Sequence, residues 1–129
     1  MIITGKYPKL RMRRSRKTDW MRRLVRENSL SSNDFILPIF VTEGINKKIP
    51  VKTMHEVFRY SVDKLGQIVD RALKLKIPMV AIFPQTNSGL KDSYGSEALN
   101  ENNLVCKAIR KIKDKYKNEI GIMTDVALD

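Results

Sequence analysis

The chain has a single cysteine, Cys106, and a single histidine, His55, among its 129 residues. One cysteine excludes an internal disulfide and suits a reducing compartment. The sequence has no group of His, Cys, Asp and Glu with the spacing of metal ligands. His55 falls in a polar loop and is interpreted as a surface residue. Cys106 falls on the apolar stripe of an expected helix, so we interpret it as a packed or half-buried small hydrophobe and not as a nucleophile.

Long hydrophobic runs are also absent. No apolar stretch approaches the roughly 20 residues that a membrane helix needs. The segment 1–8 lacks the apolar block of a signal peptide. Hydrophobic residues make up 42% and charged residues 30%, which is the composition of an ordinary globular protein. We therefore expect a cytoplasmic protein with no membrane partner.

Positive charge is abundant but unevenly placed. The formal net charge is +11, and residues 1–26 carry ten Lys or Arg against the single acid Asp19. The rest of the chain is nearly balanced. A basic segment of this kind can bind nucleic acid, dock on the acidic surface of a neighbouring subunit, or be a solvated tail. We expect two parts: a basic arm with a short helix over 1–30 and a folded body over 31–129.

Hydrophobic periodicity predicts alternating strands and helices in the body. Before it, residues 1–17 are expected to be extended and 19–28 to form a short helix capped by Asp19. Two prolines bear on the strands. Pro38 lies inside the first apolar run and counts against a central strand, and Pro84 is expected to end the second. The expected elements are a strand over 35–41, a polar connection over 42–60, a helix from Ser61 that ends at Pro78, a strand over 79–83, a polar loop over 85–100, a helix over 102–116 and a strand over 120–124.

Strands that alternate with helices are typical of a parallel α/β sheet. Their regular spacing favours the first units of a (β/α)8 barrel with long loops after the strands. A doubly wound sheet is the alternative, but no glycine-rich phosphate turn follows the first strand. Three parallel strands cannot close a barrel of eight. We therefore expect this sequence to be part of a longer chain, and by itself to leave strand edges and sheet faces uncovered.

In a barrel the active site lies at the carboxyl ends of the strands. Three candidate places are Thr42 with Glu43, Gln85 with Thr86, and Thr124 with Asp125 and Asp129. Asp125 is the strongest candidate, because a carboxylate at a barrel mouth can orient a cationic group or transfer a proton. The alternative is a carboxylate that only accepts backbone hydrogen bonds or pairs with a lysine. None of the lysines lies at the end of a buried strand, where a Schiff-base lysine would be expected.

Several segments in this order resemble one enzyme family. They are residues 11–16, 24–27, 34–41 with 43–44, 59–63, 82–84, 91–92, 95–98 with 100, and 124–129. Together they resemble the N-terminal part of porphobilinogen synthase, also called δ-aminolevulinic acid dehydratase. The resemblance covers nearly the whole chain, from about Tyr7 to Asp129.

The resemblance implies a (β/α)8 barrel whose N-terminal arm wraps a neighbouring subunit, usually in an octamer. It implies an enzyme of tetrapyrrole and haem synthesis, a lyase that joins two molecules of 5-aminolevulinate to give porphobilinogen and water. Two lysines form Schiff bases with the substrates in the family, and both lie on later strands. The resemblance therefore implies that these 129 residues alone are inactive, and it gives the arm a role other than nucleic-acid binding.

The resemblance also gives expectations for individual residues. Asp125 matches the active-site aspartate of the third strand, with a supporting acid–base or substrate-orienting role. Ala127 and Asp129 stand where zinc-dependent members have cysteines, which argues against a zinc site. This implies the branch that often uses magnesium, bound largely by residues that this sequence does not contain. Asp129 is a weaker candidate for contact with the active-site lid or a cation.

Two other functions remain open from the residues alone. One is a small basic nucleic-acid-binding module that uses residues 1–26 and binds with a steep salt dependence. The other is a self-standing α/β interaction domain, which predicts a monomer that unfolds cooperatively.

Overall fold

The computed structural model describes residues 5–11 and 13–125. The chain divides into two compact units, Met1–Leu30 and Ser31–Asp129, and each is described by itself. Ala127 and Asp129, two residues of interest in the sequence, lie outside the described residues. Among the described residues, no helix has the length and apolar character needed to cross a membrane.

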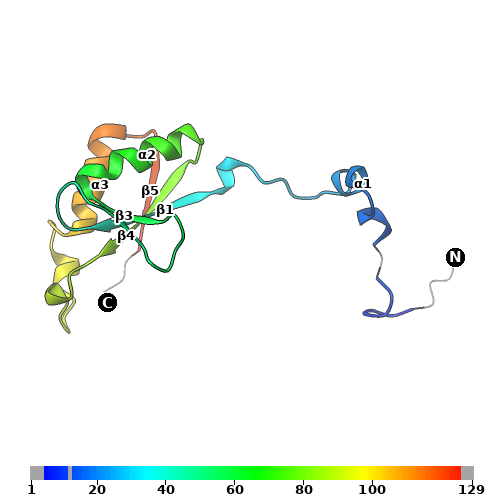
Figure 1. Cartoon of the computed structure of the whole chain (residues 1–129), viewed down its shortest axis with the longest axis horizontal. Helices are drawn as coiled ribbons and strands as arrows, with labels where there is room; N and C mark the ends of the chain where they lie inside the picture. Colours follow the sequence, from blue (N-terminus) through cyan, green and yellow to red (C-terminus); the bar gives the residue numbers. More distant parts are fainter. Residues whose placement is uncertain (1–4, 12, 126–129) are drawn as a thin grey trace. The chain divides into compact units, whose positions relative to one another are not determined.

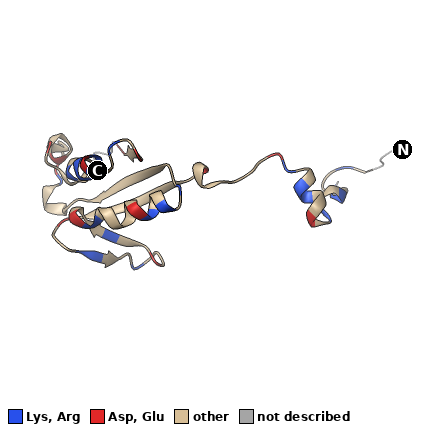
Figure 2. Ribbon diagram, turned by 90° about the horizontal axis from the view of Figure 1, so that it is seen from above, with Lys and Arg blue, Asp and Glu red and all other residues tan. Residues whose placement is uncertain are grey.

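The first unit contains one short helix, α1, over Asp19–Leu24. Asp19 lies in its first turn and pairs with Arg22 at 3.5 Å and Arg23 at 3.2 Å, all on exposed side chains. The expectation that this helix reaches residue 28 was wrong, because it ends at Leu24 with Val25 as its C-cap. The helix buries none of its residues, and a short helix without packing has little to extend it. Lys and Arg are frequent along this unit (Figure 2).

The second unit is built on a five-stranded sheet of order β2-β3-β1-β4-β5. Its strands are β1 Ile36–Thr42, β2 Lys48–Pro50, β3 Phe58–Ser61, β4 Met79–Gln85 and β5 Gly121–Thr124. The four neighbours β3, β1, β4 and β5 are parallel, and β2 alone is antiparallel, to β3. This confirms the predicted parallel sheet. The connection over 42–60 was predicted without strands, and that was wrong, because it contains the β2–β3 hairpin.

Two helices pack on the sheet, α2 over Leu65–Lys74 and α3 over Leu104–Tyr116. Both lie on the same side of it (Figure 1). Apolar residues at helical spacing face the sheet, and the buried core consists of Ile39, Val41, Leu65, Val69, Ala72, Val80, Ile82, Leu104, Ala108, Ile112, Tyr116 and Ile120. The helix predicted to end at Pro78 ends earlier, with Leu75 as C-cap. Lys76 follows with φ +57°, a left-handed conformation that terminates a helix.

Proline inside a strand has a simple structural explanation here. Pro38 lies within β1, but β3 pairs with β1 only from Phe40 onward. Pro84 lies within β4, although it was expected to end that strand, and pairing with β5 stops at Ile82. Each proline therefore lies in a stretch of strand that has a neighbour on one side only. A missing N–H costs little where one edge is unpaired.

Side chains alternate between the two faces of a strand, and the face opposite α2 and α3 carries no helix of the described part of this unit. We call it the open face, and define it by Ile36, Phe40, Ala81, Phe83 and Met123. Ile36 is 45% exposed, Phe83 38% and Met123 43%. The expectation of an uncovered sheet face is thus met in the described residues. These residues would face the interior of a barrel if the sheet continued to curve and closed.

Candidate functional site

The carboxyl ends of β1 and β4 bring two of the three candidate places together. Thr42 and Gln85 are Cα partners in the parallel ladder. The Thr42 hydroxyl Oγ1 donates to Gln85 Oε1 at 3.4 Å, and Thr42 is only 8% exposed. Glu43, the next residue, is exposed and takes no part in this pair. The predicted edge of the sheet therefore exists, with Thr42 and Gln85 at its centre.

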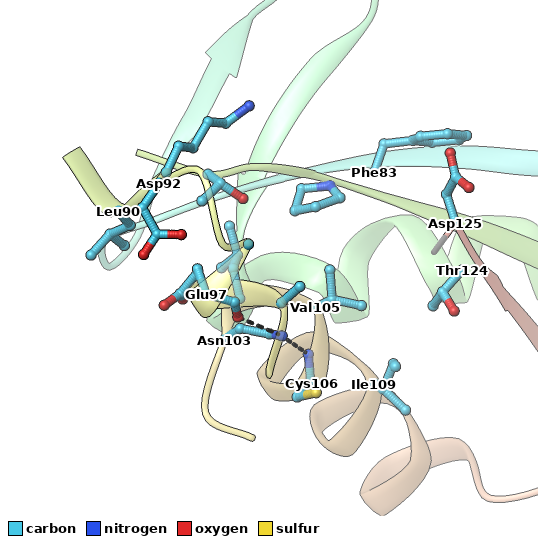
Figure 3. Close-up of a pocket in the computed structure, with 16 residues that line it drawn as sticks. Phe83, Leu90, Asp92, Glu97, Asn103, Val105, Cys106, Ile109, Thr124 and Asp125 are labelled. Carbon is cyan, nitrogen blue, oxygen red and sulfur yellow. Dashed lines mark hydrogen bonds between the residues drawn. The ribbon is translucent and has the colours of Figure 1, made fainter. Parts of the chain in front are cut away.

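A cavity of about 550 Å³ lies at the carboxyl ends of β4 and β5. Figure 3 shows its lining, which comes from the strand ends, the loop after β4 and the first turns of α3. The lining residues are Phe83, Pro84, Thr86, Leu90, Lys91, Asp92, Gly95, Glu97, Ala98, Asn103, Leu104, Val105, Cys106, Ile109, Thr124 and Asp125. Thr86, Thr124 and Asp125, which the sequence singled out, thus share one cavity.

The loop wall of the cavity is held by Asp92. Its Oδ1 accepts hydrogen bonds from the backbone N–H groups of Tyr94 and Ser96, both at 3.0 Å. The Ser96 backbone N–H is the main reason that the pKa of Asp92 lies below its ordinary value. Gly95 has φ +65°, a conformation that glycine adopts without strain. Asp92 therefore acts as an ionised acceptor that shapes the loop.

The base of the cavity is the N-terminus of α3, capped by Asn103. Asn103 Oδ1 accepts a hydrogen bond from the backbone N–H of Cys106 at 2.8 Å, and Asn103 Nδ2 donates one to the Glu97 carbonyl at 3.4 Å. One side chain thus ties the loop to the helix (Figure 3). Cys106 lines the cavity and is half-buried, as predicted for a small hydrophobe. His55 is exposed in the loop before β3 and is not among the residues that line the cavity.

The ladder also reveals a row of residues that the sequence reading missed. Phe40 is the Cα partner of Phe83 on one side and of Arg59 on the other. The rings of Phe40 and Phe83 lie 5.8 Å apart between centroids. Thr124 is the Cα partner of Ile82, so the next residues on the two strands, Asp125 and Phe83, lie at the same level of the sheet. Figure 3 shows Asp125 near Phe83, and both line the cavity. The row across the open face is therefore a cation, two rings and a carboxylate.

A signal for this row was present in the sequence. Phe40 and Phe83 each lie two residues before the end of their strands, at Thr42 and Gln85. The sequence interpretation treated both strands as buried on both faces. It therefore did not distinguish the residues that face the helices from those on the open face. Arg59 could not be placed, since β3 was not expected at all.

A parallel sheet covered by helices on one face, with polar groups and a cavity at the strand ends, is the arrangement of the first units of a (β/α) barrel. Comparison with known proteins identifies the family. The family model described as "Delta-aminolevulinic acid dehydratase" matches residues 9–129. The chain belongs to this family.

Individual relatives agree. The delta-aminolevulinic acid dehydratase of Bradyrhizobium diazoefficiens is 50% identical over 120 residues, which are 93% of this chain and 34% of that protein. The enzyme of Chlamydia pneumoniae is 38% identical over 92% of this chain and 36% of its own length. A crystal structure of the Toxoplasma gondii enzyme, also named porphobilinogen synthase and bound to the product porphobilinogen, superposes with a TM-score of 0.80. It is 30% identical, and the match covers 92% of this chain and 33% of that one. The chain thus spans about a third of the length of these relatives.

Proposed function

We propose that this chain supplies the first β/α units of an enzyme that condenses two molecules of 5-aminolevulinate to porphobilinogen with loss of water. The observation that carries the proposal is the cavity at the strand ends, which places Asp125 beside Phe83 in a fold that matches a product-bound enzyme of this family. The amine nucleophiles of the reaction would come from lysines on later strands. The chain itself contributes a wall of the active site.

We propose that Asp125 orients the substrate or acts as a supporting acid or base. An exposed carboxylate at the end of β5 can accept a hydrogen bond from a substrate ammonium group or take a proton from it. Phe40 and Phe83 form an apolar surface beside that carboxylate. In a closed active site of the complete enzyme, such a surface would help to exclude water from the carboxylate, which would strengthen its interaction with a cation. The Thr42–Gln85 pair lies two residues further along β1 and β4, where it can form the rim.

Magnesium is the metal that the resemblance implies for the complete enzyme. Among the residues that the structure describes, no three His, Cys, Asp or Glu side chains come together to hold a metal ion. The described residues therefore do not fit a metal centre, and no step proposed for this chain passes through a metal. A contact of Asp129 with a lid or a cation remains a prediction outside the described residues.

We also propose, on the family resemblance, that residues 1–30 join subunits of a homo-oligomer, an octamer in the complete enzyme. Trp20 and Leu24 on α1 are exposed. Large exposed apolar side chains often contact a partner protein, which supports a subunit-binding role for this segment. We propose in addition that the complete enzyme is cytoplasmic, which cell fractionation can test. The alternative of a nucleic-acid-binding module on residues 1–26 has no support among the comparisons reported above, which concern delta-aminolevulinic acid dehydratases.

A fusion tests the proposed function. The 129 residues are joined to the remaining two thirds of the Bradyrhizobium diazoefficiens relative, in place of that enzyme's own matched segment. We expect the fusion to form porphobilinogen and the 129-residue chain alone to form none. A folded fusion without activity, or porphobilinogen formation by the chain alone, would contradict the proposal.

A further inference from the structure

The side-chain amide of Gln85 is oriented by Thr42 at the carboxyl ends of two neighbouring strands. Gln85 is the last residue of β4 and Thr42 the last of β1. The Thr42 hydroxyl donates to Gln85 Oε1 at 3.4 Å. Thr42 is only 8% exposed, so water competes little for its hydroxyl. With its oxygen engaged by Thr42, the Gln85 amide turns its nitrogen away from β1.

The amide nitrogen of Gln85 has two N–H donors. No residue of the described part of the chain accepts a hydrogen bond from them, and Gln85 is exposed. Because side chains alternate along a strand, Gln85 lies on the same face as Phe83, which is the open face. In a closed barrel this position is at the mouth, where substrates bind. Two free donors at such a place suit an oxygen-rich ligand group such as a carboxylate.

The strand register sets the distance between Gln85 and Asp125. Asp125 is level with Phe83 on the neighbouring strand, and Gln85 lies two residues further along β4. A rise of about 3.3 Å per residue and a spacing of about 4.8 Å between strands place the two backbone positions about 8 Å apart. The open face therefore offers a carboxylate and a pair of N–H donors at this separation. They match a small molecule with an ammonium group at one end and a carboxylate at the other.

We propose that Gln85 binds the carboxylate of 5-aminolevulinate, and that Thr42 is the positioning residue that aims its amide. This inference rests on the proposed function and assigns a residue to one end of that substrate. Five bonds separate the amine nitrogen of 5-aminolevulinate from its carboxyl carbon, about 6 Å in the extended form. A hydrogen bond at each end covers the rest of the distance. One substrate molecule thus contacts both residues, with its ammonium group at Asp125 and its carboxylate at Gln85.

Steady-state kinetics of the fusion enzyme test the role of Gln85. Gln85→Met keeps the length of the side chain and removes both donors, whereas Gln85→Glu adds a charge of the same sign as the ligand. We expect the KM for 5-aminolevulinate to rise about tenfold in Gln85→Met and further in Gln85→Glu. The kcat should stay within about threefold of the parent, because the contact is made equally in the ground state and the transition state.

The control for Gln85→Glu makes the same change on the outer side of the fold. Gln67→Glu lies on an exposed residue of α2 and should leave KM unchanged. Circular dichroism checks that each variant folds. An equal rise of KM in Gln67→Glu would overturn the proposal, because the effect would then follow net charge and not position.

Thr42 gives a separate test of orientation. Thr42→Val has nearly the same size without the hydroxyl and should raise KM about threefold, whereas Thr42→Ser keeps the hydroxyl and should stay within about twofold of the parent. A rise that Thr42→Ser shares with Thr42→Val would assign the effect to packing and would overturn the positioning role.

Levulinate, which is 5-aminolevulinate without its amine, is the probe that distinguishes the two ends of the substrate. Its inhibition of the fusion should weaken at least about tenfold in Gln85→Glu and change less than about twofold in Asp125→Asn. An active fusion whose KM and levulinate inhibition are unchanged in both Gln85 variants would overturn this inference alone, and so would a loss confined to kcat. A fusion that folds and forms no porphobilinogen would overturn the proposed function, and this inference with it.

Discussion

The hydroxyl of Tyr116 donates a hydrogen bond of 2.6 Å to Asp70 Oδ1 and so joins α3 to α2. Tyr116 is 5% exposed and belongs to the buried core. Lys115 Nζ lies 3.2 Å from the other oxygen of the same carboxylate. The contact ties together the two helices that cover the sheet, and so helps to hold the strands whose ends form the site.

Removing this hydroxyl should destabilise the body. Tyr116→Phe leaves the ring in place and deletes the bond to Asp70. We expect the free energy of unfolding to fall by about 1 kcal/mol, since the carboxylate regains part of its hydration. Urea unfolding followed by circular dichroism measures it. Tyr94→Phe is the control, because Tyr94 is 88% exposed, and a similar loss there would contradict the account.

The same pair predicts a pH dependence. The Tyr116 hydroxyl is the main reason that the pKa of Asp70 lies below its ordinary value of 3.8. A lowered folded-state pKa stabilises the protein above 3.8, and this stability is lost as the pH falls through the lowered value. The stability gap between wild type and Tyr116→Phe should therefore be full at about pH 6 and shrink at about pH 2.5. If the difference in unfolding free energy between wild type and Tyr116→Phe grew on acidification, a group other than Asp70 would be responsible for the pH dependence.

Asn103 should be important for the cavity wall as well as for α3. Asn103→Ala removes the N-cap acceptor of Cys106 N–H and the bond to the Glu97 carbonyl. Loss of an N-cap costs about 1 kcal/mol. Amide hydrogen exchange should also rise in the loop 95–100, which loses its tie to the helix. Asn118→Ala, on an exposed residue after α3, should change neither quantity.

The two faces of the sheet can be distinguished by a pair of isoleucines. Ile82 is 1% exposed beneath the helices, whereas Ile36 on the open face is 45% exposed. Ile82→Ala should cost about 2–5 kcal/mol of unfolding free energy, and Ile36→Ala less than about 1 kcal/mol. Both are measured at low micromolar protein to limit association. Equal costs would mean that the open face is covered in the chain.

Sequence periodicity predicted α2, α3 and the parallel strands β1, β4 and β5, because an apolar stripe or run fixes which residues are buried. Periodicity failed to predict the segments whose structure depends on backbone pairing between strands and not on burial of side chains. Apart from the buried polar residue Ser61, the strands β2 and β3 consist of exposed and half-buried residues, so the hairpin leaves no apolar run in the sequence. Pro84 was expected to end its strand, yet the ladder with β1 continues there through Val41, at a point where β4 no longer pairs with β5.

The site could be predicted only in part for a related reason. Thr42, Gln85 and Asp125 were found because they follow apolar runs. Phe40 and Phe83 were missed because a fully apolar strand does not show which side chains face the helices. The register between strands supplies that information, and register depends on contacts distant in sequence.

The measurement that tests the central claim most directly is the rate of porphobilinogen formation by the fusion enzyme when Asp125 is changed. Asp125→Asn keeps the size of the side chain and removes its charge, whereas Asp114→Asn makes the same change on an exposed residue of α3. We predict a kcat at least about 100-fold lower for Asp125→Asn, with unchanged folding, and a kcat within about twofold of the parent fusion for Asp114→Asn. A fully active Asp125→Asn fusion would contradict the assignment of this strand end to the active site.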